Sequence, residues 1–224
     1  MRMSTEPGNV IQRMSRRSPK GGRPTQEVAA QLGAHILSVA LDQFGRTGVE
    51  GTTMDAIAAT ANVSKRTIYL RFGSKRDIIL RAIEHGFACH FDPVAAARPP
   101  DGPLKERLLY VATKFLNASL KPGVCNLEKL ADWALEHAPD IFDRLQNMMN
   151  DGPVTLIRSV LEEGVRDGEI AVSDMEFTTR FAFDALVRSP RYRILRVGEL
   201  ANHPRARREY LDRAVELLLK ALAT

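Results

Sequence analysis

Apolar residues recur at intervals of three and four along most of this chain, which is the spacing of one face of an α-helix. The first such segment covers residues 25–47, with apolar positions at Val28, Leu32, Ile36, Val39, Ala40 and Phe44. The same spacing predicts helices over residues 104–120, 126–137, 140–150, 154–166, 173–188 and 204–222. No segment alternates with a period of two, so the pattern predicts an all-α fold.

Turn-forming residues divide these helices. A helix beginning near Ser74 is expected to fade near Cys89, with a break at Asp92-Pro93 and a linker over residues 98–103. This places a first domain at residues 25–90 and a second, all-helical bundle at residues 101–224. Within the bundle, turns are expected at residues 121–123, 151–153 and 167–168.

Two short helices joined by a tight turn are predicted over residues 53–72. Thr52 and Asp55 have the spacing of a capping box, which opens a helix ending at Ala61. Asn62 tolerates the left-handed conformation that a helix C-terminus needs, and Ser64 is a favourable N-cap for the second helix. The arrangement is that of a helix-turn-helix, which places its second helix in the major groove of DNA.

The second helix is polar and basic on the faces that do not pack. Ile68 and Phe72 lie four apart and should point inward, while the first turn carries Lys65, Arg66 and Thr67. Ser74 to Asp77 forms a second capping box, which puts Lys75 beside a helix N-terminus, a favourable place for a phosphate. Residues 64–81 hold six basic side chains against one acid, so positive charge gathers where DNA would lie.

Residues 22–90 resemble the DNA-binding domain of the tetracycline-repressor (TetR) family of bacterial transcription regulators. The matching runs are Phe44-Gly45-Arg46-Thr47-Gly48, Thr52-Thr53-Met54-Asp55-Ala56-Ile57-Ala58, Val63-Ser64-Lys65-Arg66-Thr67-Ile68-Tyr69 and Phe72-Gly73-Ser74-Lys75. The resemblance implies that Thr53, Tyr69 and Lys75 contact phosphates and that Lys65, Arg66 and Thr67 face bases. The full set of expected DNA-binding residues is Arg23, Thr53, Ser64, Lys65, Arg66, Thr67, Tyr69, Arg71 and Lys75.

Two positions depart from the family pattern. Arg66 stands where many members have a small residue, which favours direct readout such as a bidentate contact with guanine. Leu70 occupies a position that is often polar or aromatic, so one phosphate contact is expected to be missing.

The charge is concentrated at the N-terminus. The 224 residues carry a net charge of +5, and residues 1–24 alone hold six basic side chains against one acid. This segment lacks a helical period, so we expect a disordered basic arm, with Arg23 at its end entering a minor groove. The alternative is a flexible solubilising tail.

Several classes of protein do not fit the composition. No apolar run is long enough to span a membrane, and no secretion signal is present, so a cytoplasmic location is expected. Cys89 and Cys125 lack metal-ligand or redox spacing and are expected to be free thiols. Asp132, Glu136 and His137 are more consistent with a solvated helix face than with a metal site. No catalytic constellation or cofactor motif is present, so neither an enzyme, a cofactor nor a metal is predicted.

The C-terminal bundle has two expected roles by the same resemblance, dimerisation and the binding of a small molecule. Residues 173–188 and 204–222 are the candidates for a two-fold, four-helix interface. The candidate effector pocket comprises Phe115, Trp133, Phe142, Met148, Met149 and Phe181, although aromatic residues and methionines at this spacing more often form core. A second basic region, from Arg188 to Arg208, is interpreted as a solvated loop; an acidic partner or an anionic effector would also fit.

The sequence therefore predicts a homodimeric, ligand-responsive repressor that binds an inverted-repeat operator in double-stranded DNA. One alternative is a regulator without a small-molecule effector. A less favoured one is an enzyme that uses the helical bundle.

Overall fold

The computed structural model describes residues 25–137 and 142–223, and of residues 142–153 it describes the backbone only. All regular secondary structure in these ranges is helical, which confirms the all-α prediction. The elements are α2 (Gln26–Gly51), α3 (Met54–Thr60), α4 (Lys65–Phe72), α5 (Lys75–Ala95), α6 (Leu104–Ser119), α7 (Pro122–His137), α8 (Phe142–Arg166), α9 (Met175–Phe183), η2 (Asp184–Arg188), α10 (Ser189–Tyr192), η3 (Arg193–Val197) and α11 (Pro204–Leu222).

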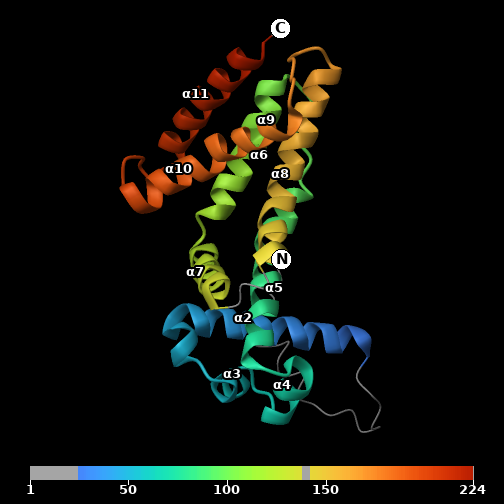
Figure 1. The fold of residues 1–224 in the computed structure, drawn as a ribbon, viewed down its shortest axis with the longest axis vertical. Coiled ribbons are helices and arrows are strands. Elements are labelled where there is room, and N and C mark those ends of the chain that lie inside the picture. Colours follow the sequence, from blue (N-terminus) through green and yellow to red (C-terminus); the bar gives the residue numbers. More distant parts are fainter. Residues whose placement is uncertain (1–24, 138–141, 224) are drawn as a thin grey trace, which may run out of the picture.

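The molecule is elongated, with a small head at one end and a helical body at the other (Figure 1). We call residues 25–90 the head. Helix α2 crosses it as a floor, α3 and α4 lie on its outer side, and α5 runs from the head into the body (Figure 1). Ile36, Ile57, Ile68 and Ile78 are fully buried where these four helices meet, which explains why their apolar positions recur at helical spacing.

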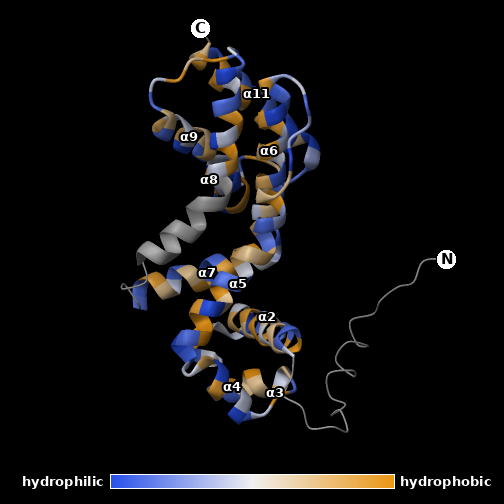
Figure 2. Ribbon diagram, turned by 90° about the vertical axis from the view of Figure 1, so that its right-hand side faces the viewer, coloured by the Kyte–Doolittle hydropathy of each residue, from blue (hydrophilic) through white to orange (hydrophobic). Residues whose placement is uncertain are grey.

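Helix α7 packs mainly against the head. Its buried residues Leu127, Leu130, Ala131 and Ala134 belong to the same apolar cluster as the head. The sequence prediction assigned this helix to the C-terminal domain, since it follows the linker. The spacing of apolar residues shows that a helix has a buried face, but it does not reveal which core that face joins. In Figure 2, hydrophobic and hydrophilic residues follow one another along α7, which lies beside α5 next to the head.

A second apolar cluster holds the body together. It combines residues of α6, α8, α9, η2 and α11, among them the fully buried Phe115, Leu161, Leu186 and Val215. The chain end of α11 lies at the far tip of the molecule, away from α3 and α4 (Figure 1). None of the described helices is both long enough and apolar enough to cross a membrane.

Prolines interrupt the helices less than the sequence predicts. Pro93 lies inside α5, so the expected break at Asp92-Pro93 is wrong. Pro93 is exposed and only two residues from the helix end at Ala95, so the carbonyl group it leaves unbonded can reach water. The turn expected at residues 151–153 also lies within a helix, α8; the residue before Pro153 is Gly152, whose missing Cβ removes the usual clash with the proline ring. The expected stop at residues 121–123 is the start of α7, with Pro122 in the first helical position.

The basic region from Arg188 to Arg208 is mainly helical, not a solvated loop. It includes η2, α10 and η3, which continue α9, and the first turns of α11. Its arginines are largely paired: Arg191 forms an ion pair with Glu128 of α7 and donates to the carbonyl oxygen of Ser119 at 3.0 Å. Acidic residues four positions away account for other pairs, such as Arg205 with Glu209. The N-cap of α9 is Asp174, one residue after the expected Ser173.

Candidate nucleic-acid interface

Two adjacent threonines have different hydrogen-bond partners at the start of α3. The side chain of Thr53 caps the helix by accepting a hydrogen bond from the Ala56 N–H at 3.1 Å. Thr52 is buried and donates to the carbonyl oxygen of Gly48 at 2.7 Å, closing the end of α2. The predicted capping box between Thr52 and Asp55 is therefore wrong, because the hydroxyl that caps α3 is one residue further along.

The turn between α3 and α4 follows the sequence prediction. Asn62 adopts the left-handed conformation, with φ of 54°. Ser64 caps α4 by accepting from the Thr67 N–H at 3.0 Å, and the two hydroxyl groups lie 2.8 Å apart. Ile68 and Phe72 are 0% and 4% exposed, so α4 is anchored through its inner face and presents its other faces outward.

The outward faces of α4 carry the polar residues expected to meet DNA. Arg66 is exposed, and Tyr69 and Leu70 are 49% and 76% exposed. Lys65 reaches back to α3 and forms an ion pair with Asp55, at 2.5 Å between Nζ and Oδ2. The hydrogen bond to this carboxylate raises the pKa of Lys65.

Arg71 differs from the other basic residues of α4. Its guanidinium donates to the carbonyl oxygen of Ala29 on α2 at 2.8 Å and lies against Gly33, where a Cβ would meet the guanidinium nitrogen at 2.9 Å. The side chain is half-buried. Arg71 therefore links α4 to α2, whereas the sequence analysis expected it among the residues that face DNA.

Lys75 opens α5 directly after a complete capping box. Asp77 N–H donates to Ser74 Oγ, and Ser74 N–H donates to the Asp77 carboxylate, both at 3.2 Å. The hydrogen bond from the Ser74 hydroxyl lowers the pKa of Asp77. Gly73, with φ of 75°, ends α4, and α5 begins immediately afterwards with Ser74 as its N-cap. Most of the expected DNA-binding residues thus belong to the helix-turn-helix or to the start of the helix after it: Thr53, Ser64, Lys65, Arg66, Thr67, Tyr69 and Lys75. Arg23 lies outside the described residues.

The three candidate effector residues whose side chains the structure describes do not converge on one cavity. Phe115 is fully buried in the apolar cluster of the body, Trp133 packs against the cluster of the head, and Phe181 is 53% exposed. The side chains of Phe142, Met148 and Met149 lie outside the described residues. Sequence reasoning treated all six as one pocket because helical spacing does not tell which helix faces meet.

The structure instead brings Trp133 close to Lys75. Both residues line a cavity of about 280 Å³ between the head and the end of α7. They are 58 positions apart in the chain, and no local pattern links them, so sequence reasoning missed this pairing.

Comparisons with known proteins agree with the helix-turn-helix. The profile of the bacterial regulatory proteins of the tetR family matches residues 36–82. An uncharacterised HTH-type transcriptional regulator of Mycobacterium tuberculosis is 30% identical over 142 residues, which cover 62% of this chain and 67% of that protein. The fatty acid metabolism regulator protein of Bacillus subtilis is 25% identical over 135 residues, covering 60% of this chain and 69% of that protein.

The fold extends the similarity beyond the head. The solved structure of a protein assigned to the TetR family of transcriptional regulators, from Mesorhizobium loti, matches 90% of this chain and 100% of its own, with a TM-score of 0.76 at 18% identity. Such proteins bind DNA and are not enzymes. With its capped helix-turn-helix, its buried anchors on α4 and these relatives, the chain belongs to the TetR family of DNA-binding transcriptional regulators.

Proposed function

We propose that this regulator acts in the cytoplasm as a homodimer that binds an inverted-repeat operator and represses transcription until a small molecule releases it. The observation that carries the DNA-binding part is the geometry of α4, whose inner face is anchored by Ile68 and Phe72 while Arg66 and Tyr69 remain exposed. A rigidly packed helix with an exposed polar face is what insertion into a major groove requires.

The places of the individual side chains support the roles proposed for them. Lys65, Arg66 and Thr67 occupy the first turn of α4, the part of a recognition helix that reaches base edges. Thr53 at the start of α3, Tyr69 on α4 and Lys75 at the start of α5 contact phosphates on either side of the groove.

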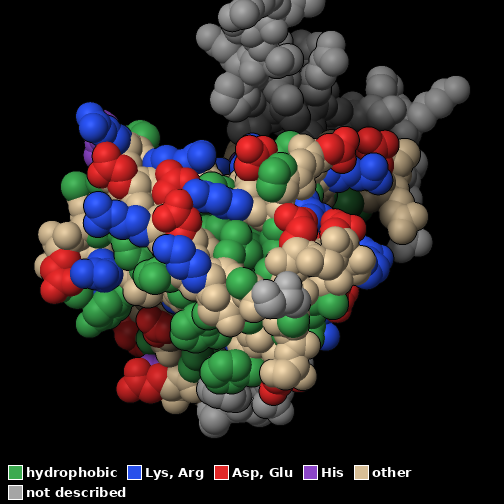
Figure 3. All heavy atoms as spheres, turned by 90° about the horizontal axis from the view of Figure 1, so that it is seen from above, with side chains coloured by type: hydrophobic (Ala, Val, Ile, Leu, Met, Phe, Trp, Pro, Cys, Tyr) green, Lys and Arg blue, Asp and Glu red, His purple; other side chains and the backbone are tan. Residues whose placement is uncertain are grey.

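Dimerisation is supported by an apolar surface on the body. Phe177 and Phe181 of α9 are 67% and 53% exposed and stack on each other, with 6.3 Å between ring centroids. Leu217 of α11 is 69% exposed. Hydrophobic side chains are grouped among charged ones at this end of the molecule (Figure 3). Exposed apolar patches of this kind are typical of protein interfaces, and two helices from each copy would form a four-helix contact.

Binding in pairs sets the operator geometry. A two-fold dimer presents two copies of α4, so we expect two half-sites of opposite orientation, about 34–36 Å or a multiple of that apart. A ligand that favours a conformation with a different spacing lowers DNA affinity by its preference for that conformation.

The experiment is selection of genomic fragments on the purified protein, followed by sequencing, with Tyr69→Ala and Lys75→Ala in parallel. Recovery of a palindromic motif by the wild type, lost in both variants, would support the proposal. Diffuse, salt-sensitive binding that survives both substitutions would contradict it, because the basic N-terminal arm would then dominate.

The second candidate is a regulator with no small-molecule effector. The dispersal of Phe115, Trp133 and Phe181 favours it, since the expected pocket is not assembled from these residues. Release of the operator by extracts or compound libraries would exclude this candidate, whereas unchanged operator binding in all of them would support it.

A further inference from the structure

The cavity between the head and α7 has walls of two chemical kinds. Its apolar side is formed by Val49 and Ile79, which are 7% and 1% exposed. Trp133 and His137 form an aromatic side, and Lys75, Arg76 and Glu50 supply the charges. The volume of about 280 Å³ lies at the lower limit of ligand pockets, so an occupant must be small.

The aromatic side is held rigidly. The rings of Trp133 and His137 stack with 4.4 Å between centroids and 8° between planes. His137 Nδ1 lies 2.9 Å from the carbonyl oxygen of Trp133, which fixes the imidazole on the same helix. Two parallel, stacked rings that are already positioned offer a flat outer face, and flat aromatic groups pack well against such a face.

The charged side favours an anion. Among the charged residues that line the cavity, Lys75 begins α5, where the helix dipole adds to the positive potential; Asp77 in the same first turn does not line the cavity. Lys75 forms no ion pair with any residue in the described part of the chain. A carboxylate placed there gains a partner without displacing an ion pair of Lys75.

We infer that this cavity binds a small aromatic carboxylate with one ring, which lies along Trp133 and directs its carboxylate to Lys75. The link to regulation rests on the proposed function, in which Lys75 contacts an operator phosphate. A carboxylate on Lys75 competes with that phosphate, so the ligand weakens DNA binding and DNA weakens ligand binding by the same factor. This release operates at the head itself, without a change in the spacing of the two heads.

The chain carries its own reporter for this site. Trp133 is the only tryptophan in the sequence, so intrinsic tryptophan fluorescence reports on this cavity alone. The full-length protein is titrated with benzoate, with benzamide, which lacks the charge, and with cyclohexanecarboxylate, which lacks the aromatic ring. We expect a saturable fluorescence change with benzoate, and binding of each analogue weaker by roughly fivefold.

Two variants test the contact with Lys75. Lys75→Gln is expected to weaken benzoate binding by roughly three- to fivefold, which is typical of one partly exposed ion pair. Lys129→Gln is the matched control, since Lys129 is exposed on the same helix as Trp133 but does not line the cavity. No fluorescence change with benzoate, or equal binding by wild type and Lys75→Gln, would overturn the site.

A DNA titration separates this inference from the proposed function. Operator fragments are bound to the wild type with and without saturating benzoate, and a several-fold loss of affinity is expected. Benzoate binding in a protein that binds no operator would overturn the proposed function and leave the site intact. Operator binding without any response of Trp133 would do the reverse. Benzoate binding that leaves operator affinity unchanged would overturn the competition at Lys75.

Discussion

Residues of the same charge have different tasks on α4 and at the start of α5. Arg66 is exposed on the first turn of α4, Arg71 is half-buried against α2, and Lys75 begins α5. Lys65 is paired with Asp55 across the two helices of the motif. Mutations at these positions should therefore differ in kind and not only in size.

Arg66→Ala should relax the preference for particular bases, because a guanidinium can form two hydrogen bonds with guanine and alanine none. Each such contact discriminates by about 1–3 kcal/mol. Lys75→Ala should weaken binding to all sequences and lower the salt slope by about 1, because it removes a phosphate contact. Binding to operator and scrambled duplexes over a salt series measures both. An equal loss on every sequence with Arg66→Ala would refute its role in base readout.

Arg71→Met should destabilise the protein by about 1 kcal/mol, because it removes the hydrogen bond to the Ala29 carbonyl oxygen at a partly exposed site. Urea unfolding measures the change. Arg66→Met is the control, since an exposed residue on the same helix should change the free energy of unfolding by less than about 0.5 kcal/mol. Equal stability of the two variants would show that the tie of Arg71 to α2 contributes little.

At the scale of single elements, hydroxyl caps determine where the helices of the head begin. Thr25, Thr53, Ser64 and Ser74 each accept a backbone N–H at the start of a helix. Only Ser74 forms a complete capping box, and α5, which it opens, is the helix that connects the head with the body.

Ser74→Ala should lower the stability of the head by about 1 kcal/mol at neutral pH. The Ser74 hydroxyl lowers the folded-state pKa of Asp77 below the ordinary value of 3.8. The contribution of Asp77 is therefore fully present above the unfolded-state pKa and is lost as the pH falls through the folded-state pKa. The difference between wild type and variant should then shrink below about pH 4. Denaturant unfolding over a series from pH 7 down to pH 2 measures it, and a difference that grows in acid would contradict this assignment.

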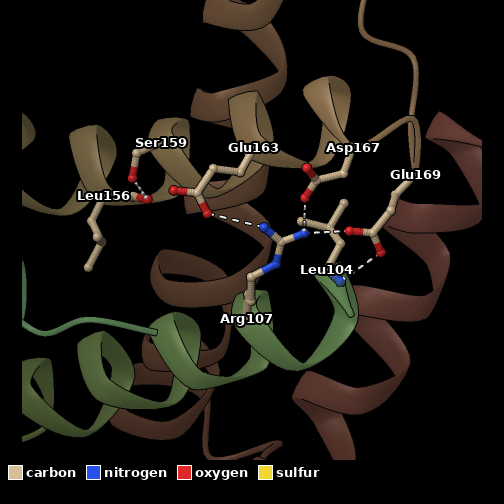
Figure 4. A network of polar contacts seen from close by, with 7 residues as sticks. All are labelled: Leu104, Arg107, Leu156, Ser159, Glu163, Asp167 and Glu169. Atoms are coloured by element: carbon tan, nitrogen blue, oxygen red, sulfur yellow. Dashed lines mark hydrogen bonds and ion pairs between the residues drawn. The ribbon is translucent and has the colours of Figure 1, made fainter. Parts of the chain in front are cut away.

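At the scale of the whole molecule, one buried arginine joins α6 to the end of α8. Arg107 is 8% exposed and pairs with Glu163 and Asp167, each at 3.1 Å, and with Glu169 (Figure 4). Glu169 also accepts from the Leu104 N–H at 2.8 Å, which secures the first turn of α6. Three carboxylates therefore depend on a single cation.

Arg107→Met should cost about 2–4 kcal/mol, because it leaves the three carboxylates without their counter-ion. The value is below that of a fully buried network since Glu163 and Asp167 are 42% and 55% exposed. The control is Lys105→Met, whose ion pair with Glu216 is half-exposed and should contribute less than about 1 kcal/mol. Thermal unfolding compares the two, and a similar small change in both would refute the role of Arg107.

Phe177→Asp combined with Phe181→Asp should convert the proposed dimer into a monomer, because two charges would replace the stacked rings at its centre. Sedimentation equilibrium measures the mass. Val165→Asp is a control on α8, at a position that is 39% exposed and outside the proposed interface. A wild type that is already monomeric, or a double variant that stays dimeric, would place the interface elsewhere.

The order of helices in the head could be predicted from local chemistry. The residues that cap and end these helices interact only with neighbours a few positions away in the sequence, so both partners of each interaction can be read locally. They are Asn62, Ser64, Gly73, Ser74 and Asp77. The exposed polar face of α4 follows in the same way from the spacing of Ile68 and Phe72. The predictions at Pro93 and Pro153 are wrong because the cost of a proline depends on its surroundings: on whether the unbonded carbonyl group reaches water at Pro93, and on the preceding glycine at Pro153.

The sequence by itself determined the all-α class, the helix-turn-helix and the basic face of its second helix, since these depend on contacts three or four residues apart. Only the tertiary structure decided that α7 packs on the head, that Arg71 turns toward α2, and that Lys75 and Trp133 line the same cavity. These contacts join segments that are more than 40 residues apart, and any of several apolar helix faces could have formed them. Which faces meet depends on the packing of the whole chain, and that choice also places the cavity between the head and α7.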